Sequence, residues 1–135
     1  EGDEDPFKIY GPSQTRAFCF ITDAAEGTVL AMESESSNQE IFHMGSPNEI
    51  TIEELTKTIG GLMGYDGDYV DAKTYPGSVS RRCPDITKSI KFLGYQPKVL
   101  WKDGLKESIA WYTDFFKSGA EIHSGGFKKP GDLHF

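Results

Sequence analysis

Apolar residues recur every three or four positions in four segments of the chain, which is the spacing of an amphipathic helix. The predicted helices start at residue 22 or 23, at 51, at 85 and at 102, and they end near residues 34, 63, 93 and 117. The second helix has the clearest signals, because Thr51 can cap it, Glu54 stands at its third position and Gly64 can end it. Its apolar stripe consists of Ile52, Leu55, Ile59, Leu62 and Met63.

The other helices carry weaker versions of the same signals. Asp23 followed by Glu26 resembles a capping box, and Asp85 can cap the third helix. Gly60 and Gly61 weaken the second helix by about 1 kcal/mol each relative to alanine, which indicates close packing there. The predicted buried faces are Ala25, Val29 and Met32, then Ile86, Ile90 and Leu93, then Leu105, Ile109, Tyr112 and Phe116.

Four short segments are candidate β-strands. Residues 7–10 alternate between apolar and polar side chains, and residues 68–73 also read as a strand. Residues 17–21 are almost continuously apolar, which predicts a strand buried on both faces. Residues 40–44 form the fourth candidate, closed by Gly45. Short strands that alternate with helices predict an α/β fold, or α+β for an isolated fragment.

The length of 135 residues predicts one domain. We divide the chain into an acidic leader loop at residues 1–6, a domain at residues 7–117 and an irregular glycine-rich tail at residues 118–135. With 37% hydrophobic and 13% aromatic residues, the composition is that of a globular protein.

Charge and cysteine content exclude several classes of protein. The formal net charge is −7, which argues against a nucleic-acid partner and means that an anion must bind in a local pocket. No apolar run approaches the ~20 residues that span a membrane, and the acidic first residues are unlike a signal peptide. Cys19 and Cys83 have no metal-ligand neighbours at short spacing, so we expect reduced thiols, no metal site and a cytoplasmic protein.

The chain has three arginines, at two places in the sequence. Arg16 stands just before an apolar segment, with Gln14 two residues earlier. Arg81 and Arg82 precede the helix that Asp85 is expected to cap, where anions collect. The planar guanidinium suits a phosphate, so the two places together favour an anion ligand. The alternatives are a surface arginine in a turn for Arg16 and an ion pair with a structural carboxylate for Arg82.

Two catalytic motifs can be set aside. Tyr69 and Lys73 match the Tyr-x-x-x-Lys spacing, but in a strand the two would lie ~13 Å apart rather than on one helical face. The glycines at residues 60–64 lie in a helix rather than between a strand and a helix, so they do not form a dinucleotide-binding loop. The three histidines, His43, His123 and His134, lack the spacing of metal ligands or of a nucleophile's partner.

Four segments in order resemble the substrate-binding half of the extended short-chain dehydrogenase/reductases, the NAD-dependent nucleotide-sugar epimerases, dehydratases and decarboxylases. The first is Phe-Lys-Ile-Tyr-Gly-Pro-Ser-Gln-Thr-Arg-Ala-Phe-Cys-Phe-Ile-Thr-Asp, and the others lie at residues 41–55, 81–97 and 104–112. The resemblance covers roughly residues 6–117. Through Gln-Thr-Arg-Ala-Phe, the uridine-diphosphate-glucuronate decarboxylases are the most similar members.

The resemblance implies that residues 7–117 form a nucleotide-sugar-binding domain. In the family, the arginines that match Arg16 and Arg82 grip the diphosphate of a UDP- or dTDP-sugar, and Arg81 is a further candidate. The segment at Tyr10 and Gln14 line the nucleotide or sugar side of the pocket. The base, the sugar and the reaction stay open.

The family's N-terminal Rossmann part, with its glycine loop and its Tyr-x-x-x-Lys pair, is absent from this chain. The resemblance therefore implies a C-terminal part of an enzyme, with NAD bound only in the intact enzyme and no catalytic residue here. The expected partners are a nucleotide-diphosphate sugar and the Rossmann part, in cis or in trans, and a homo-oligomer stays open. The alternative is a stand-alone binding or assembly module of the same fold.

Two positions depart from the family pattern. The turn at Pro12 and Ser13 is one residue shorter than usual and lacks a second glycine, and His43 replaces the usual asparagine before Met44 and Gly45. The first departure bears on the nucleotide contact and the second on packing.

Overall fold

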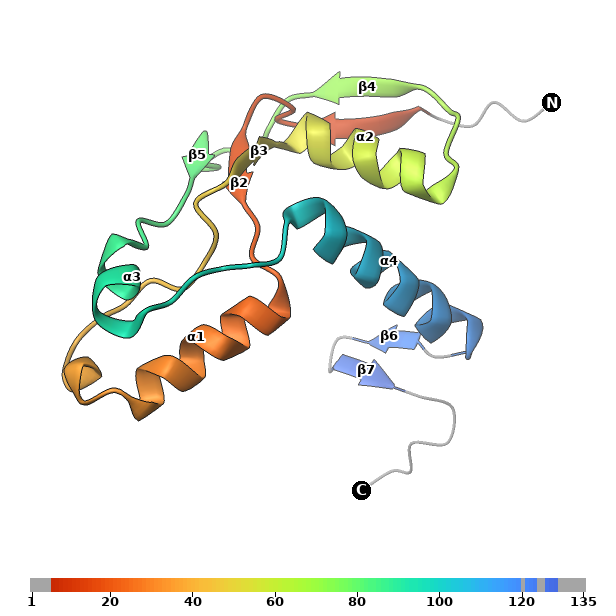
Figure 1. Ribbon diagram of the computed structural model, residues 1–135. Coiled ribbons are helices and arrows are strands. Elements are labelled where there is room, and N and C mark those ends of the chain that lie inside the picture. The colour runs from red at the N-terminus through yellow and green to blue at the C-terminus, as the bar shows by residue number, and fades with distance from the viewer. Residues whose placement is uncertain (1–5, 120, 124–125, 129–135) are drawn as a thin grey trace. The chain divides into compact units, whose positions relative to one another are not determined.

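The computed structural model describes residues 6–119, 121–123 and 126–128 (Figure 1). The chain groups into two compact units, Glu1–Trp101 and Lys102–Phe135. The break lies at the start of the last helix, whereas the sequence placed the end of the main domain after that helix, at residue 117. Most of the predicted leader, residues 1–5, lies outside the described residues.

The first unit contains two small sheets (Figure 1). In one sheet, β1 (Phe7–Tyr10) pairs in parallel with β4 (Tyr69–Ala72). In the other, β2 (Thr15–Ala17) lies between the antiparallel β3 (Glu49–Thr51) and the parallel β5 (Arg81–Arg82). The strand predictions for residues 7–10 and 68–73 are therefore confirmed, the second with one residue trimmed at each end.

The other two strand predictions were wrong. The strand predicted at residues 17–21 ends at Ala17, where the ladder with β3 also ends, and Ile21 already belongs to a helix. Ile21 is 70% exposed, so the apolar run is not buried on both faces. Residues 40–44 form no strand, and the pairing partner of β2 follows at β3 instead. Backbone pairing decides these positions, and apolar content alone does not reveal it.

Helix α1 (Ile21–Glu33) buries a different face from the one predicted. Its buried residues are Asp23 and Gly27, while Val29 and Met32 are exposed. A Cβ atom on Gly27 would lie 2.7 Å from the Met44 sulfur, so a glycine is needed for this close approach. The helix starts at Ile21 with no side-chain cap, so Asp23 is not a capping residue.

Buried Asp23 joins α1 to a distant part of the chain. Its carboxylate accepts a hydrogen bond from the Val99 backbone N–H at 2.9 Å. Glu26, its predicted capping-box partner, instead forms an ion pair with Lys98 at 2.7 Å. Both acids therefore hold residues 98 and 99 against the helix.

Helix α2 (Ile52–Met63) matches its prediction at both ends. The Thr51 hydroxyl accepts a hydrogen bond from the Glu54 N–H at 3.0 Å, and Gly64 ends the helix with a φ of 73°. The close packing predicted from the glycines is found at Gly60, where a Cβ atom would lie 1.9 Å from the Tyr69 hydroxyl oxygen. No atom of the described residues would lie within 4 Å of a Cβ atom on Gly61, and Leu62 and Met63 at the end of the predicted stripe are exposed.

The core of the first unit is formed by residues around α3 (Thr87–Leu93). Ile86, Leu93 and Tyr95 are buried against α1 and the segment before β3, whereas Ile90 is 46% exposed. Asp85 accepts a hydrogen bond from the Thr87 N–H at 2.9 Å, but the N-cap position is Ile86. A short 3-10 helix, η1 (Glu35–Ser37), follows α1.

The second unit contains α4 (Trp101–Lys117) and a hairpin of β6 (Glu121–His123) and β7 (Gly126–Lys128). The hairpin lies where the sequence predicted an irregular tail, and residues 120, 124–125 and 129–135 lie outside the described residues. In α4 the buried residues are Gly104 and Phe115; of the predicted face, Leu105 and Ile109 are half-buried and Tyr112 and Phe116 are exposed. Among the described residues, no helix has the length and apolar content to cross a membrane.

Candidate functional site

The three-stranded sheet brings the two arginine segments together. In the parallel ladder of β2 and β5, Arg16 lies beside Arg82 and Thr15 lies beside Arg81. Side chains alternate between the two faces of a strand, so Arg16 and Arg82 share one face and Arg81 belongs to the other. The two segments are far apart in the sequence, and only strand pairing makes Arg16 and Arg82 neighbours.

Arg16 is held in place by oxygen atoms around its guanidinium. Its Nη1 donates a hydrogen bond to the Thr15 carbonyl at 2.7 Å. Its Nη2 donates to the Val79 carbonyl at 2.9 Å and to the Gln14 Oε1 at 3.1 Å. These acceptors are neutral, so they orient the guanidinium without cancelling its charge.

Gln14 supports Arg16 from below the surface, with 9% of its area exposed. Its Nε2 donates to the Thr74 hydroxyl at 3.0 Å, and its Oε1 accepts from Ser78 at 3.1 Å as well as from Arg16. Gly11 has a positive φ of 65°, and a Cβ atom there would lie 2.8 Å from the Gln14 side chain, so the turn before Gln14 requires a glycine. Gln14 thus ties the segment before β5 to Arg16.

Arg82 differs from Arg16 because its side chain is exposed. Within the described part of the chain, it makes no hydrogen bond or ion pair. The ion pair that the sequence analysis offered as an alternative for Arg82 is instead made by its neighbour. Arg82 therefore brings to the Arg16 face a positive charge that no carboxylate of the described residues pairs with.

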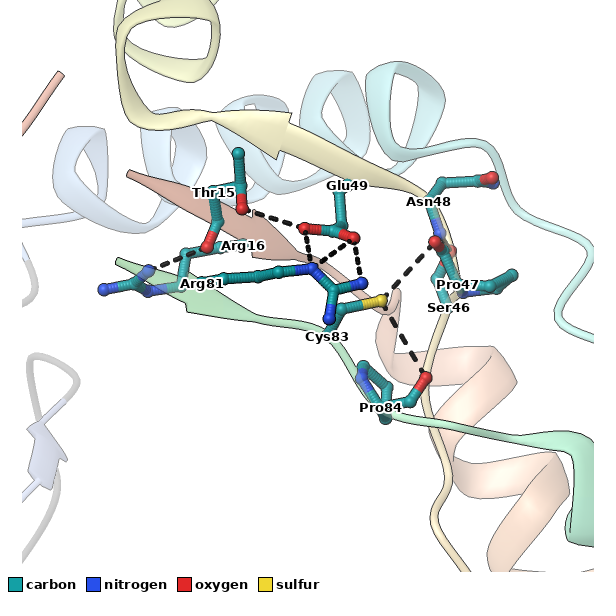
Figure 2. A network of polar contacts seen from close by, with 9 residues as sticks. All are labelled: Thr15, Arg16, Ser46, Pro47, Asn48, Glu49, Arg81, Cys83 and Pro84. Carbon is teal, nitrogen blue, oxygen red and sulfur yellow. Dashed lines mark hydrogen bonds and ion pairs between the residues drawn. The ribbon is translucent and has the colours of Figure 1, made fainter. Parts of the chain in front are cut away.

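Arg81 is bound to a carboxylate on the opposite face of the sheet, as Figure 2 shows. Its Nε donates to both oxygens of Glu49, each at 3.0 Å, and its Nη2 also contacts Glu49. Thr15 donates its hydroxyl hydrogen to Glu49 at 2.8 Å. The Arg81 and Thr15 hydrogen bonds lower the pKa of the Glu49 carboxyl below its usual value. Arg81, predicted to bind substrate, is therefore occupied by a structural acid.

Tyr10 ends β1 and stacks on Tyr75, with ring centroids 5.2 Å apart and 17° between the planes. Both rings are exposed, at 44% and 67%. Tyr75 follows Thr74, the hydrogen-bond partner of Gln14, so this aromatic pair belongs to the same set of loops as the Arg16 anchor.

The placement of the arginines corrects one expectation about the site. The sequence placed Arg81 and Arg82 just before the positive end of a helix, but they form β5 and α3 begins only at Thr87. The site is thus built on strand pairing. Sequence reasoning missed Glu49, because an acid 32 residues from its arginine gives no local signal.

Sequence comparison finds two decarboxylases of UDP-linked uronates among the relatives of this chain. The chain is 36% identical over 117 residues to a UDP-N-acetyl-alpha-D-glucosaminuronate decarboxylase of Bacillus cytotoxicus, covering 82% of this chain and 36% of that protein. It is 34% identical over 93 residues to UDP-glucuronic acid decarboxylase 6 of Arabidopsis thaliana, covering 69% of this chain and 26% of that protein. The homologues of this chain are extended short-chain dehydrogenase/reductases. No family model matches the chain.

Solved structures of extended short-chain dehydrogenase/reductases show the same fold. The UDP-glucuronic acid 4-epimerase of Bacillus cereus, in complex with UDP-glucuronic acid and NAD, matches with a TM-score of 0.73 and 28% identity. The UDP-glucose 4-epimerase of Thermotoga maritima, with UDP-glucose, matches with a TM-score of 0.74 and 27% identity. Each match covers 82% of this chain and 36% of the solved chain. The predicted fold class is therefore confirmed, and the chain spans about a third of the length of these relatives.

The described residues do not fit the NAD that the solved epimerase of Bacillus cereus carries. Among them, no strand leads through a glycine-rich turn into a helix, and Gly60 is packed against Tyr69 rather than open to a dinucleotide. The same residues contain no group of three histidine, cysteine or acidic side chains arranged to hold a metal ion. The site therefore provides the positive charges of Arg16 and Arg82.

Proposed function

We propose that this chain is the substrate-binding part of an NAD-dependent nucleotide-sugar enzyme and that Arg16 and Arg82 grip the diphosphate of its substrate. The observation that carries the proposal is the pairing of these arginines on one face of β2 and β5. Neighbouring strands lie about 4.8 Å apart, so the two side chains leave the sheet side by side, and an anion between them would reduce the repulsion of their like charges. A diphosphate offers two adjacent anionic groups with oxygens for both guanidinia.

The other candidate residues take supporting roles in this proposal. Gln14 orients Arg16, and the exposed ring of Tyr10 lines the nucleotide or sugar side of the pocket. Arg81 acts through its ion pair with Glu49. A UDP-sugar is the favoured ligand and decarboxylation the favoured reaction of the intact enzyme, because the relatives named above include two decarboxylases of UDP-linked uronates.

Titration calorimetry with UDP tests the proposal. Arg16→Ala and Arg82→Ala should each lower the affinity for UDP by ~1.5–3 kcal/mol, the magnitude of a hydrogen bond to a charged group. The double variant should lose less than the sum of the two, because both side chains act on one ligand.

Lys106→Ala is a suitable control, because Lys106 is exposed on α4 and pairs only with nearby Asp103 among the contacts described. It removes one positive charge from a side chain outside the hydrogen-bond network of Arg16 and should leave the affinity for UDP nearly unchanged. Equal affinities for the wild type and both arginine variants would contradict the shared pocket.

A further inference from the structure

Arg82 lies between two residues that are both anchored to the segment just before and within β3. On one side, Arg81 forms its ion pair with Glu49. On the other, the Cys83 thiol lies 3.5 Å from the Pro47 carbonyl oxygen, to which it donates (Figure 2). Because alternate residues of an extended chain point to the same side, these two contacts leave Arg82 directed to the opposite face.

The backbone alone gives β5 little support. The strand has only two residues, and it pairs only with β2 among the described strands. Glu49 reaches across β2 from the far strand, binding Arg81 at the same time as Thr15. Thr15 precedes Arg16, so one carboxylate ties together the residues next to both candidate anion-binding arginines.

We infer that Glu49 is a positioning residue: by holding Arg81 and Thr15, it sets the spacing of Arg82 and Arg16 without touching the ligand. The inference rests on the proposed function, and it gives an acidic residue, Glu49, a role in the binding of an anion. Glu49 belongs to the face opposite the two arginines, because it pairs with Ala17 in the ladder and Ala17 alternates with Arg16.

The sign of the effect separates this role from simple electrostatics. Glu49 carries a negative charge near the proposed anion site. If only Coulomb repulsion mattered, removing this charge would raise the affinity for UDP. If Glu49 holds Arg82 in place, its removal lowers the affinity instead. The two explanations therefore predict opposite changes for the same variant.

The experiment compares UDP affinities of the wild type, Glu49→Gln and Glu53→Gln by calorimetry. Glu49→Gln removes the charge and keeps the size of the side chain, and we expect about tenfold weaker binding, the effect of losing one charged hydrogen bond. Glu53→Gln is the matched control, because Glu53 also pairs with a cation, Lys57, but on α2. It should leave the affinity unchanged. Unchanged or tighter binding by Glu49→Gln would overturn the inference.

Two further variants show whether Glu49 acts through Arg82. Arg81→Lys keeps the charge but loses the forked geometry, so it should weaken UDP binding in the same direction as Glu49→Gln. In an Arg82→Ala background, Glu49→Gln should cause little further loss. A full additional tenfold loss in that background would contradict the positioning role.

Amide hydrogen exchange separates failure of the inference from failure of the proposed function. Glu49→Gln should speed exchange at residues 81–83 while exchange in α2 stays unchanged, whether or not UDP is present. If Glu49→Gln shows this change and the wild type does not bind UDP, the diphosphate site is refuted and Glu49 remains the residue that holds β5. Unchanged exchange at residues 81–83 would refute the role of Glu49 itself.

Discussion

At the residue scale, the clearest contrast is between Arg81 and Arg82. They are adjacent in the sequence and identical in chemistry, yet Arg81 is bound in two places to Glu49 while Arg82 has no such partner among the described residues. The alternation of side chains along a strand separates them. Arg81 therefore supports the sheet and Arg82 is available to a ligand only because consecutive residues of a strand point to opposite faces.

A second residue-scale contrast lies in α2 and gives a stability prediction. Gly60→Ala should destabilise the protein by ~1–3 kcal/mol, because the new methyl group would collide with the Tyr69 hydroxyl oxygen, and the Tyr69 ring is itself packed against Phe7 and Tyr65. Gly61→Ala should instead stabilise it by up to ~1 kcal/mol, because the position is open and alanine favours the helix. Urea denaturation of both variants measures the difference. Equal effects from the two substitutions would contradict the packing of Gly60.

At the element scale, β2 is the strand that brings the residues of the site together. β2 lies between β3 and β5, so it places Arg16 next to Arg82 and Thr15 next to Arg81 and Glu49. Helix α2 follows β3 directly. The Thr51 cap is therefore also the junction between the strand that carries Glu49 and the helix that follows.

Loss of the Thr51 cap at this junction should measurably lower the stability of the protein. Thr51→Ala should lower the free energy of unfolding by ~1 kcal/mol, because the Glu54 N–H loses its hydrogen-bond acceptor. Thr51→Ser keeps the hydroxyl and should retain most of the stability. Thermal or urea unfolding of the two variants provides the test, and an alanine variant no less stable than the serine variant would show that the cap contributes nothing.

At the scale of the whole molecule, the main fact is that the chain spans about a third of the relatives to which it is similar. Those relatives include structures with both a nucleotide sugar and NAD, whereas the described residues here provide positive charge but no fit for a dinucleotide. Two hypotheses remain in competition: the substrate part of an enzyme, and a stand-alone binding module with the same fold.

Residues 1–135 expressed alone should therefore bind UDP, show no saturable binding of NAD and convert no UDP-glucuronate. Calorimetry with each ligand and product analysis by chromatography check the three outcomes. Turnover of UDP-glucuronate by this chain alone would contradict the proposal that the chain binds the substrate but carries no catalytic residue.

Adding a separately produced Rossmann part separates the two hypotheses. The enzyme hypothesis predicts that NAD-dependent turnover of a nucleotide sugar appears in the mixture and is lost with Arg16→Ala. A stand-alone module would keep its affinity for UDP and gain no activity.

Much of the fold was predictable where the signals are local. The cap at Thr51, the stop at Gly64 and the strand at residues 7–10 depend on neighbouring residues, and the structure confirms them. The apolar face of α1 was wrong, because Val29 and Met32 face away from the core while Gly27 permits close contact with Met44 and Tyr95. Apolar periodicity shows which face can be buried, but a neighbouring element decides which face is buried.

The sequence by itself determined the presence of two arginine segments, the ends of α2 and the similarity to nucleotide-sugar enzymes. Only the tertiary structure decided which arginines are neighbours, that Arg81 belongs to Glu49, and that the site is built on strands rather than on a helix terminus. The physical reason is distance along the chain. Caps and turns join residues a few positions apart, whereas strand register joins residues separated by dozens of positions, and no local pattern encodes that pairing.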